Sequence, residues 1–203
     1  MTNLIRSVAL CAIVLTLGLF SRAMAELSPL LSTMNADNVT LYPGLIAYPN
    51  GGFHPMGVIY TITAPVGTGT GTGAQTLGTY SLPANALDAV GRKLRISATF
   101  STAANTHAKT CTLNFGAAPV QISTGSMTTS SQTASLGMVV TKTGSNTQTV
   151  TATGLVATTP LANAITAATE TDTGALTIAA ICTDGTSAAN DATLQDFFVE
   201  YMN

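Results

Sequence analysis

The chain has 203 residues, which is enough for one domain of ordinary size with extensions and for a substantial buried core. Charged residues make up only 8% of it, about a third of the ~25% that is usual for soluble domains. The net charge is −2, and the one basic cluster is Arg92-Lys93-Arg95. Strand alternation puts Lys93 on the opposite face from the two arginines. Because nucleic-acid binding needs a dense basic surface, the sequence argues against it.

The first 25 residues have the layout of a secretory signal. Arg6 supplies a positive start, Val8–Phe20 is an apolar run, and Ala23-Met24-Ala25 matches a cleavage site. The apolar run is shorter than the ~20 residues that a membrane-spanning helix needs. The segment therefore indicates export, and contact with a membrane is expected only where residues 1–25 are retained.

Residues 26–74 are expected to form an irregular anchoring arm that contains one strand, at Gly57–Thr63, and ends in a hinge. Prolines and glycines interrupt any long element in residues 26–56, yet this segment is too apolar for a solvated linker. Its apolar side chains must be buried on the chain's own sandwich or on a partner. The Gly67–Gly73 tract alternates Gly with Thr, which is typical of a flexible joint. The residues that we assign to anchoring are Leu41, Leu45, Ile46 and Phe53.

Residues 75–203 are expected to form the main domain, because short alternating strands follow one another there without a long helical period. Turn-forming residues such as Gly144-Ser145-Asn146 separate the strands, and Leu161–Ala168 fits a helical turn or a loop. The predicted strands are Gln75–Leu82, Lys93–Thr102, Ala108–Phe115, Pro119–Ser123, Thr133–Thr143, Thr147–Thr158, Ala175–Thr183 and Thr193–Met202. The pattern predicts an all-β fold, an antiparallel β-sandwich, and the spacing alone fits a jelly roll and an immunoglobulin-like sandwich equally.

The order of these strands and the residues in their loops also resemble those of a known protein family. A strand runs into a Leu82-Pro83-Ala84-Asn85 corner, Gly91 then precedes two strands that end at Phe100 and Phe115, and the chain closes with Phe197–Met202. This layout resembles structural proteins of tailed-bacteriophage virions, in particular the β-sandwich domains of tail-fibre, head-fibre and capsid-decoration proteins. The resemblance covers about the last two thirds of the chain. It implies a jelly-roll-like sandwich in a virion, in contact with other virion proteins.

The low charge content predicts a homo-oligomer, since large buried interfaces are depleted in Lys, Glu and Asp. A lone sandwich of this composition would expose a weakly solvated surface. Together with the resemblance, this leads us to expect a trimer that packs through its sandwich and is held to a neighbouring protein by the arm.

No catalytic motif is present in the sequence. His54 stands beside a proline and His107 in a loop, away from any recognisable nucleophile motif. Glu170 and Asp172 lie in a Thr-rich loop and are interpreted as solubilising charges, because glycoside hydrolysis also needs groups that bind the sugar, and aromatic residues are scarce here. We therefore predict a non-enzymatic protein with no catalytic residue, no cofactor and no metal site.

Cys111 and Cys182 lie outside the apolar run that holds Cys11. Cys111 alternates in phase with Leu113 and Phe115 and should face the core. In an exported domain these two cysteines would suffice for one disulfide, whereas two buried thiols fit the sequence equally well.

Two functional hypotheses remain. The first is a virion subunit that keeps Met1 or Thr2 as its first residue. The second is an exported β-sandwich, an adhesin or glycan-binding module that begins at Glu26 and is secreted, periplasmic or displayed at the cell surface.

Overall fold

The computed structural model describes residues 45–47, 53–55, 57–116 and 120–202, and it divides the chain into two units, Met1–Pro55 and Met56–Asn203. In the first unit, β1 (Leu45–Ala47) pairs antiparallel with β2 (Phe53–Pro55), with Ile46 opposite His54. The segment that we expected to be irregular therefore contains a short strand pair. Asn50-Gly51, a dipeptide that favours tight hairpins, stands between the two strands in the sequence.

The second unit consists of strands joined by turns and loops, with no helix among its described residues. Each of the eight strands predicted after residue 74 is present, with ends within about two residues of the prediction. The strands are β3 (Gly57–Thr61), β4 (Val66–Gly67), β5 (Gly73–Leu82), β6 (Lys93–Thr102), β7 (Lys109–Phe115), β8 (Val120–Ser123), β9 (Thr133–Gly144), β10 (Thr147–Val156), β11 (Thr159–Pro160), β12 (Ala164–Ala168), β13 (Leu176–Asp184) and β14 (Ala192–Tyr201).

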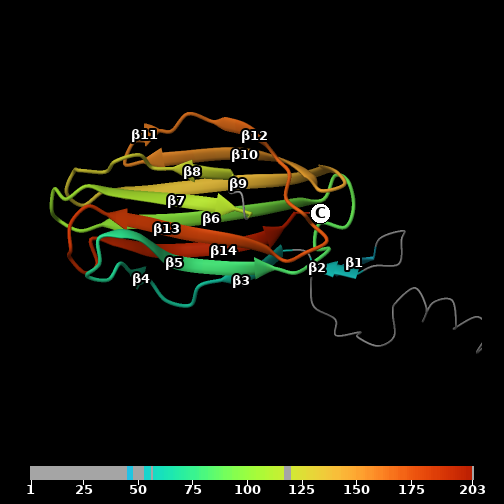
Figure 1. Ribbon diagram of the computed structural model, residues 1–203, viewed down its shortest axis with the longest axis horizontal. Coiled ribbons are helices and arrows are strands. Elements are labelled where there is room, and N and C mark those ends of the chain that lie inside the picture. Colours follow the sequence, from blue (N-terminus) through green and yellow to red (C-terminus); the bar gives the residue numbers. More distant parts are fainter. Residues whose placement is uncertain (1–44, 48–52, 56, 117–119, 203) are drawn as a thin grey trace, which may run out of the picture. The chain divides into compact units, whose positions relative to one another are not determined.

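These strands form two antiparallel sheets that face each other (Figure 1). The smaller sheet has the order β5-β13-β7-β8, and the larger one contains the order β3-β14-β6-β9. When the eight strands of these two orders are numbered along the chain from β3 to β14, the larger sheet has the order 1-8-3-6 and the smaller one 2-7-4-5, which is the order of a jelly roll. The larger sheet is then extended beyond β9 by β10, whose far side pairs with β11 and β12. The strand order decides between the two sandwich topologies that spacing left open.

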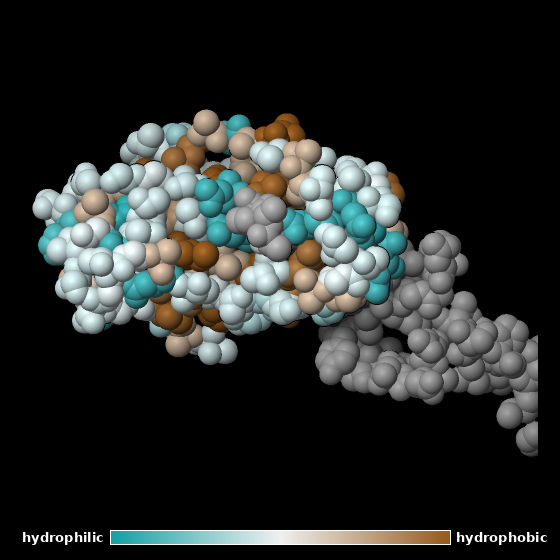
Figure 2. Space-filling model, in the orientation of Figure 1, coloured by the Kyte–Doolittle hydropathy of each residue, from teal (hydrophilic) through white to brown (hydrophobic). Residues whose placement is uncertain are grey.

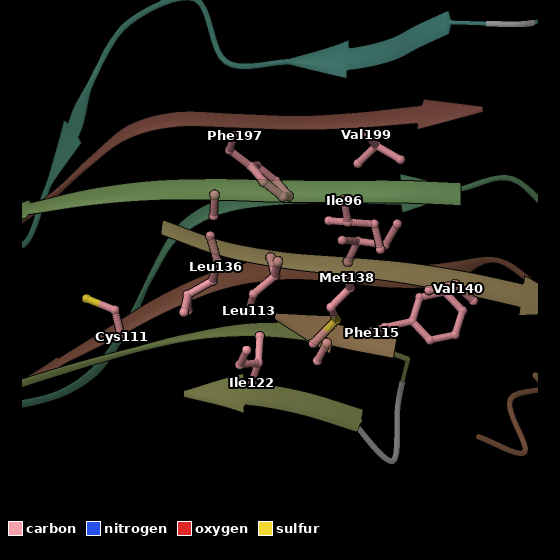
Figure 3. Packing of buried hydrophobic residues seen from close by; sticks show 14 of the residues in the cluster. Ile96, Cys111, Leu113, Phe115, Ile122, Leu136, Met138, Val140, Phe197 and Val199 are labelled. Carbon is pink, nitrogen blue, oxygen red and sulfur yellow. The ribbon is translucent and has the colours of Figure 1, made fainter. Parts of the chain in front are cut away.

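The core lies between the sheets and follows from period-two alternation. On β6, Leu94, Ile96, Ala98 and Phe100 are buried while the residues between them face outward. Figure 3 shows side chains of the larger sheet, such as Met138, meeting side chains of the smaller one. Burying one large apolar side chain contributes about 1.5–3 kcal/mol, so this layer supplies most of the fold's stability.

Gly78 marks a place where the two sheets come very close. A Cβ atom on this residue would lie 2.8 Å from both Leu194 Cδ2 and Phe197 Cδ1. Both neighbours are fully buried, so they have little room to move aside. A glycine at this point of β5 therefore lets the sheets pack at their observed separation.

The start of the sandwich differs from the expectation. β3 and β4 both pair with β14, so strands before residue 75 belong to the larger sheet. The Gly67–Gly73 tract connects β4 to β5 within the sandwich and is not a joint between arm and domain. Buried Thr68 donates its N–H to Ala192 O at 2.9 Å, and Gln75 accepts from Gly69 N at 2.7 Å. These hydrogen bonds hold the tract on the sandwich despite its flexible composition.

Candidate functional site

The outer face of the larger sheet is covered mainly by hydroxyl side chains. They come from three adjacent strands, β6, β9 and β10, and include Ser97, Thr99, Ser101, Thr133, Ser135, Thr141, Thr149, Thr151 and Thr153. The chain carries no charged residue from Thr143 to Thr169, a stretch that includes β10, β11 and β12. The β9–β12 part of this side therefore carries mainly hydroxyl groups, whereas the outward-facing charges of the larger sheet lie on β6 and β14, as Lys93, Arg95, Asp196 and Glu200.

Gly137 opens a shallow hollow in the middle of this face. It lies between Ser97 of β6 and Thr153 of β10 in the strand register, so a missing side chain leaves space between two hydroxyl residues. One hollow of about 350 Å³ extends from here toward Gly154 and Leu155. A second one, of about 420 Å³, extends the other way toward Arg95 and Phe198 and shares Ser97, Gly137 and Thr153 with the first. The two together cross the sheet from β10 to β14.

Charges are confined to one end of this groove. Arg95 forms an ion pair with Glu200 and lies 6.0 Å from the ring centroid of Phe198. Half of the Arg95 side chain is exposed, so this pair contributes at most about 1 kcal/mol to stability. Arg92, the other arginine of the basic cluster, is buried and binds Asp88 at 2.8 Å. Both arginines of the basic cluster are thus paired with acidic side chains.

A buried polar cluster lies at one end of the sandwich, where the β6–β7 loop approaches the start of β14. Asp191 accepts a hydrogen bond from Asn105 Nδ2 at 2.6 Å and one from His107 Nδ1 at 2.7 Å. Lys109, which has no exposed surface, donates its ammonium to the side-chain and backbone oxygens of Asn105. Burial acts to raise the pKa of Asp191, but the two hydrogen bonds and the nearby positive charges outweigh it and lower that pKa.

Asp184 stands opposite Lys109 in the β13–β7 register and completes this cluster. Its side chain is buried, and neither carboxylate oxygen makes a hydrogen bond of ordinary geometry within the described residues. Burial raises the pKa of Asp184, and the Thr68 hydroxyl and the charge of Lys109 only partly oppose this. His107 and Asp191 thus hydrogen-bond each other and Asn105, and no Ser or Cys among the described residues bonds their side chains.

Glu170 and Asp172, which we interpreted as solubilising charges, are both buried, so that interpretation is wrong. Asp172 Oδ2 lies 2.6 Å from Lys142 Nζ, and the side chain of Gln148 hydrogen-bonds the backbone N–H and C=O of Glu170. These contacts fasten the connection between β12 and β13 onto β9 and β10. A Thr-rich composition suggested an exposed loop, whereas long-range pairing draws the loop inward.

The cysteines are brought together by strand pairing. Cys111 of β7 and Cys182 of β13 are direct partners in the register, with Cα atoms 4.1 Å apart and sulfur atoms 2.01 Å apart, which is a disulfide. Both are fully buried. Of the two alternatives that the sequence left open, the structure contains the disulfide.

The other sequence-based assignments fall in the first unit. Leu45 and Ile46 lie on β1 and Phe53 and His54 on β2, whereas Leu41 and the signal-like residues 1–25 lie outside the described residues. Within the part of the chain that the structure describes, no helix has the length and apolar character to cross a membrane. The same part contains no group of three or more His, Cys, Asp and Glu side chains arranged to hold a metal.

Comparison with known proteins gives only remote similarities. No protein-family model and no curated protein matches the chain. One similar solved structure is the CBM2 module of the evolved Dit protein of Lactobacillus casei BL23 phage J-1, with 11% identity, a TM-score of 0.31, and coverage of 85% of this chain and 94% of that one. Another is infectious bursal disease virus, strain Gx, with 12% identity, a TM-score of 0.27, and coverage of 81% of this chain and 34% of that chain. At these scores neither similarity says what this chain does.

Proposed function

We propose that this protein is a non-enzymatic structural subunit of a bacteriophage virion, of the fibre or capsid-decoration type. It acts by packing into a homotrimer and by attaching to a neighbouring virion protein. The observation that carries the proposal is the charge-free stretch of β10–β12, which continues the hydroxyl-rich outer face of β9. The buried centre of a protein interface is depleted in charge in the same way.

Two further features support an assembly role. The jelly-roll order is used by viral capsid domains as well as by lectins and cupins, and it is compatible with an assembly role. The charged groups of the described residues are mostly engaged in the fold itself, as with Lys142 and Asp172 or His107 and Asp191. Such groups hold the sandwich in shape and are poorly placed to meet a substrate.

Oligomer mass and particle content test this proposal. Multi-angle light scattering of the purified full-length protein should give three times the mass of the 20.6 kDa chain, and mass spectrometry of purified particles should detect the protein. A monomer at micromolar concentration would exclude the packing mechanism. Absence from particles that infect normally would exclude the virion role.

A second candidate is an exported adhesin or glycan-binding module. It is favoured by the Cys111–Cys182 disulfide, since such bonds persist in oxidising compartments, and by the hydroxyl-lined groove at Gly137. The first residue of the mature protein separates the two candidates. Glu26 supports export, and an intact Met1 or Thr2 in an assembled particle supports the virion.

A further inference from the structure

The exposed apolar side chains of the sandwich gather at two opposite margins of the larger sheet. Within the described residues, Ile165 (78% exposed) and Leu155 mark the β10–β12 margin, and Val58 (59% exposed) and Val66 mark the β3–β4 margin. In the described part of the chain, two other large apolar residues are exposed, Val90 between β5 and β6 and Met202 after β14. Figure 1 shows β12 along the upper margin and β3 and β4 along the lower one, and Figure 2 shows brown patches at both places.

β12 is an edge strand without the usual protection against pairing. Its inner side pairs with β10 in unbroken register from Ala164 to Ala168, and no described strand pairs with its outer side. Edge strands are normally protected by a charge, a proline, a bulge or very short length. β12 has none of the first three over its five residues, and four of them are exposed. Of the other edge strands, β8 of the smaller sheet has four residues, and β5 and β3 each carry one register shift, which in β3 falls between Val58 and Tyr60.

The opposite edge of the same sheet is complementary to β12 in direction. The path β12-β10-β9-β6-β14-β3 contains six strands, each antiparallel to the next, so β12 and β3 run in opposite directions. A rotation axis parallel to the strands keeps these directions in every copy. β12 of one copy and β3 of the next then meet as an antiparallel pair, which continues the ladder from molecule to molecule.

We propose that the contact between subunits is an antiparallel pairing of β12 from one copy with β3 from the next, repeated head to tail from copy to copy. This inference rests on the homo-oligomer of the proposed function and specifies the surfaces that it uses. Head-to-tail pairing covers both apolar margins. Two-fold pairing of β12 with itself would leave the β3 margin, with Val58 exposed, without a cover. The absence of charge on both strands means that no charged group has to be desolvated in the contact.

Thiol crosslinking tests the proposed pairing directly. In a Cys11→Ser background, the only free thiols of the double variant Val58→Cys/Ile165→Cys are the introduced ones, because Cys111 and Cys182 are bonded to each other. A short bismaleimide should convert this variant into dimers and trimers on a denaturing gel. Either single variant should stay uncrosslinked, and so should the control Val90→Cys/Ile165→Cys. Dimers from Ile165→Cys alone would overturn the proposal in favour of two-fold pairing.

A charge placed on each margin gives an independent test. Ile165→Lys and Val58→Lys should each raise the dissociation constant of the oligomer about tenfold or more, while Val90→Lys, on a residue of similar exposure, leaves it unchanged. Circular dichroism should show all three variants folded. A trimer that tolerates both margin charges and resists crosslinking would refute the pairing but keep the proposed function. A monomeric wild-type protein would refute both.

Discussion

The disulfide between Cys111 and Cys182 should account for a large part of the stability of the sandwich. The two residues are 71 positions apart, and closing a loop of that length removes chain entropy from the unfolded state worth about 4 kcal/mol at 25 °C. For a domain of this size, a change of 1 kcal/mol moves the melting temperature by roughly 2–4 °C. The double variant Cys111→Ala/Cys182→Ala should therefore melt roughly 8–16 °C below the oxidised wild type.

Two comparisons separate the crosslink from simple packing. Both sulfur atoms are buried, so replacing them with alanine also removes apolar contacts. Reduced wild-type protein keeps those contacts but lacks the bond, and it should lose most of the same stability in urea unfolding. A thiol titration of the unreduced, denatured full-length chain should find one thiol, Cys11, and none where residues 1–25 have been removed.

Two results would refute this reasoning. Three free thiols in the denatured full-length chain would show that the bond is absent in solution. An unchanged melting temperature after complete reduction would show that the crosslink adds nothing beyond the pairing of β7 with β13. In that second case, the stabilisation that comes from the lower entropy of the crosslinked unfolded chain is cancelled by an opposite effect of the bond on the native or the unfolded state.

Three further predictions concern charged groups. Lys142→Met should cost about 3–5 kcal/mol in urea unfolding because it leaves Asp172 buried without its ion partner, whereas Arg95→Met at the exposed pair should cost at most about 1 kcal/mol. Asp191→Asn should lower the free energy of unfolding at neutral pH, because it removes the stabilising carboxylate charge. As the pH falls through the lowered pKa of Asp191, the wild type loses that charge as well, so the two proteins should become equally stable. Asp184→Asn should stabilise the protein at neutral pH, and this gain should shrink as the pH falls through the raised pKa of Asp184, because protonation relieves the wild type of its buried charge. A stability difference that is independent of pH would contradict either of the last two.

Most strands of the sandwich could be predicted from the sequence because they divide their residues between core and solvent. β6 shows this most clearly, with Leu94, Ile96, Ala98 and Phe100 all buried and the alternate positions outside. β12 lacks this signal, since only Ala168 of its five residues is buried, and its pairing with β10 gives it strand geometry. Where a strand depends on its neighbour more than on its own pattern, the sequence pattern does not reveal it.

The polar sites could not be predicted for a related reason. Lys142 and Asp172 are 30 positions apart, and His107 and Asp191 are 84 apart, with no repeat or motif that links them. The Gly67–Gly73 tract shows the reverse error, since its composition is that of a hinge while Gln75 and the strands around it hold it in place. Composition describes the tendency of an isolated segment, and contacts distant in sequence decide what the segment does.

The disulfide also bears on which of the two candidate functions is right, because the fold serves both equally. Both sulfur atoms are buried in the core between the two sheets, so reaction with a small thiol or oxidant requires the sandwich to open locally. The state of the pair is therefore set mainly where the chain folds. A chain that folds in a reducing cytoplasm before assembly keeps two thiols, and one that folds after export acquires the bond. Alkylation of denatured protein taken directly from native particles or from the cell exterior thus reports the folding compartment, and it does so even where the N-terminus has been trimmed later.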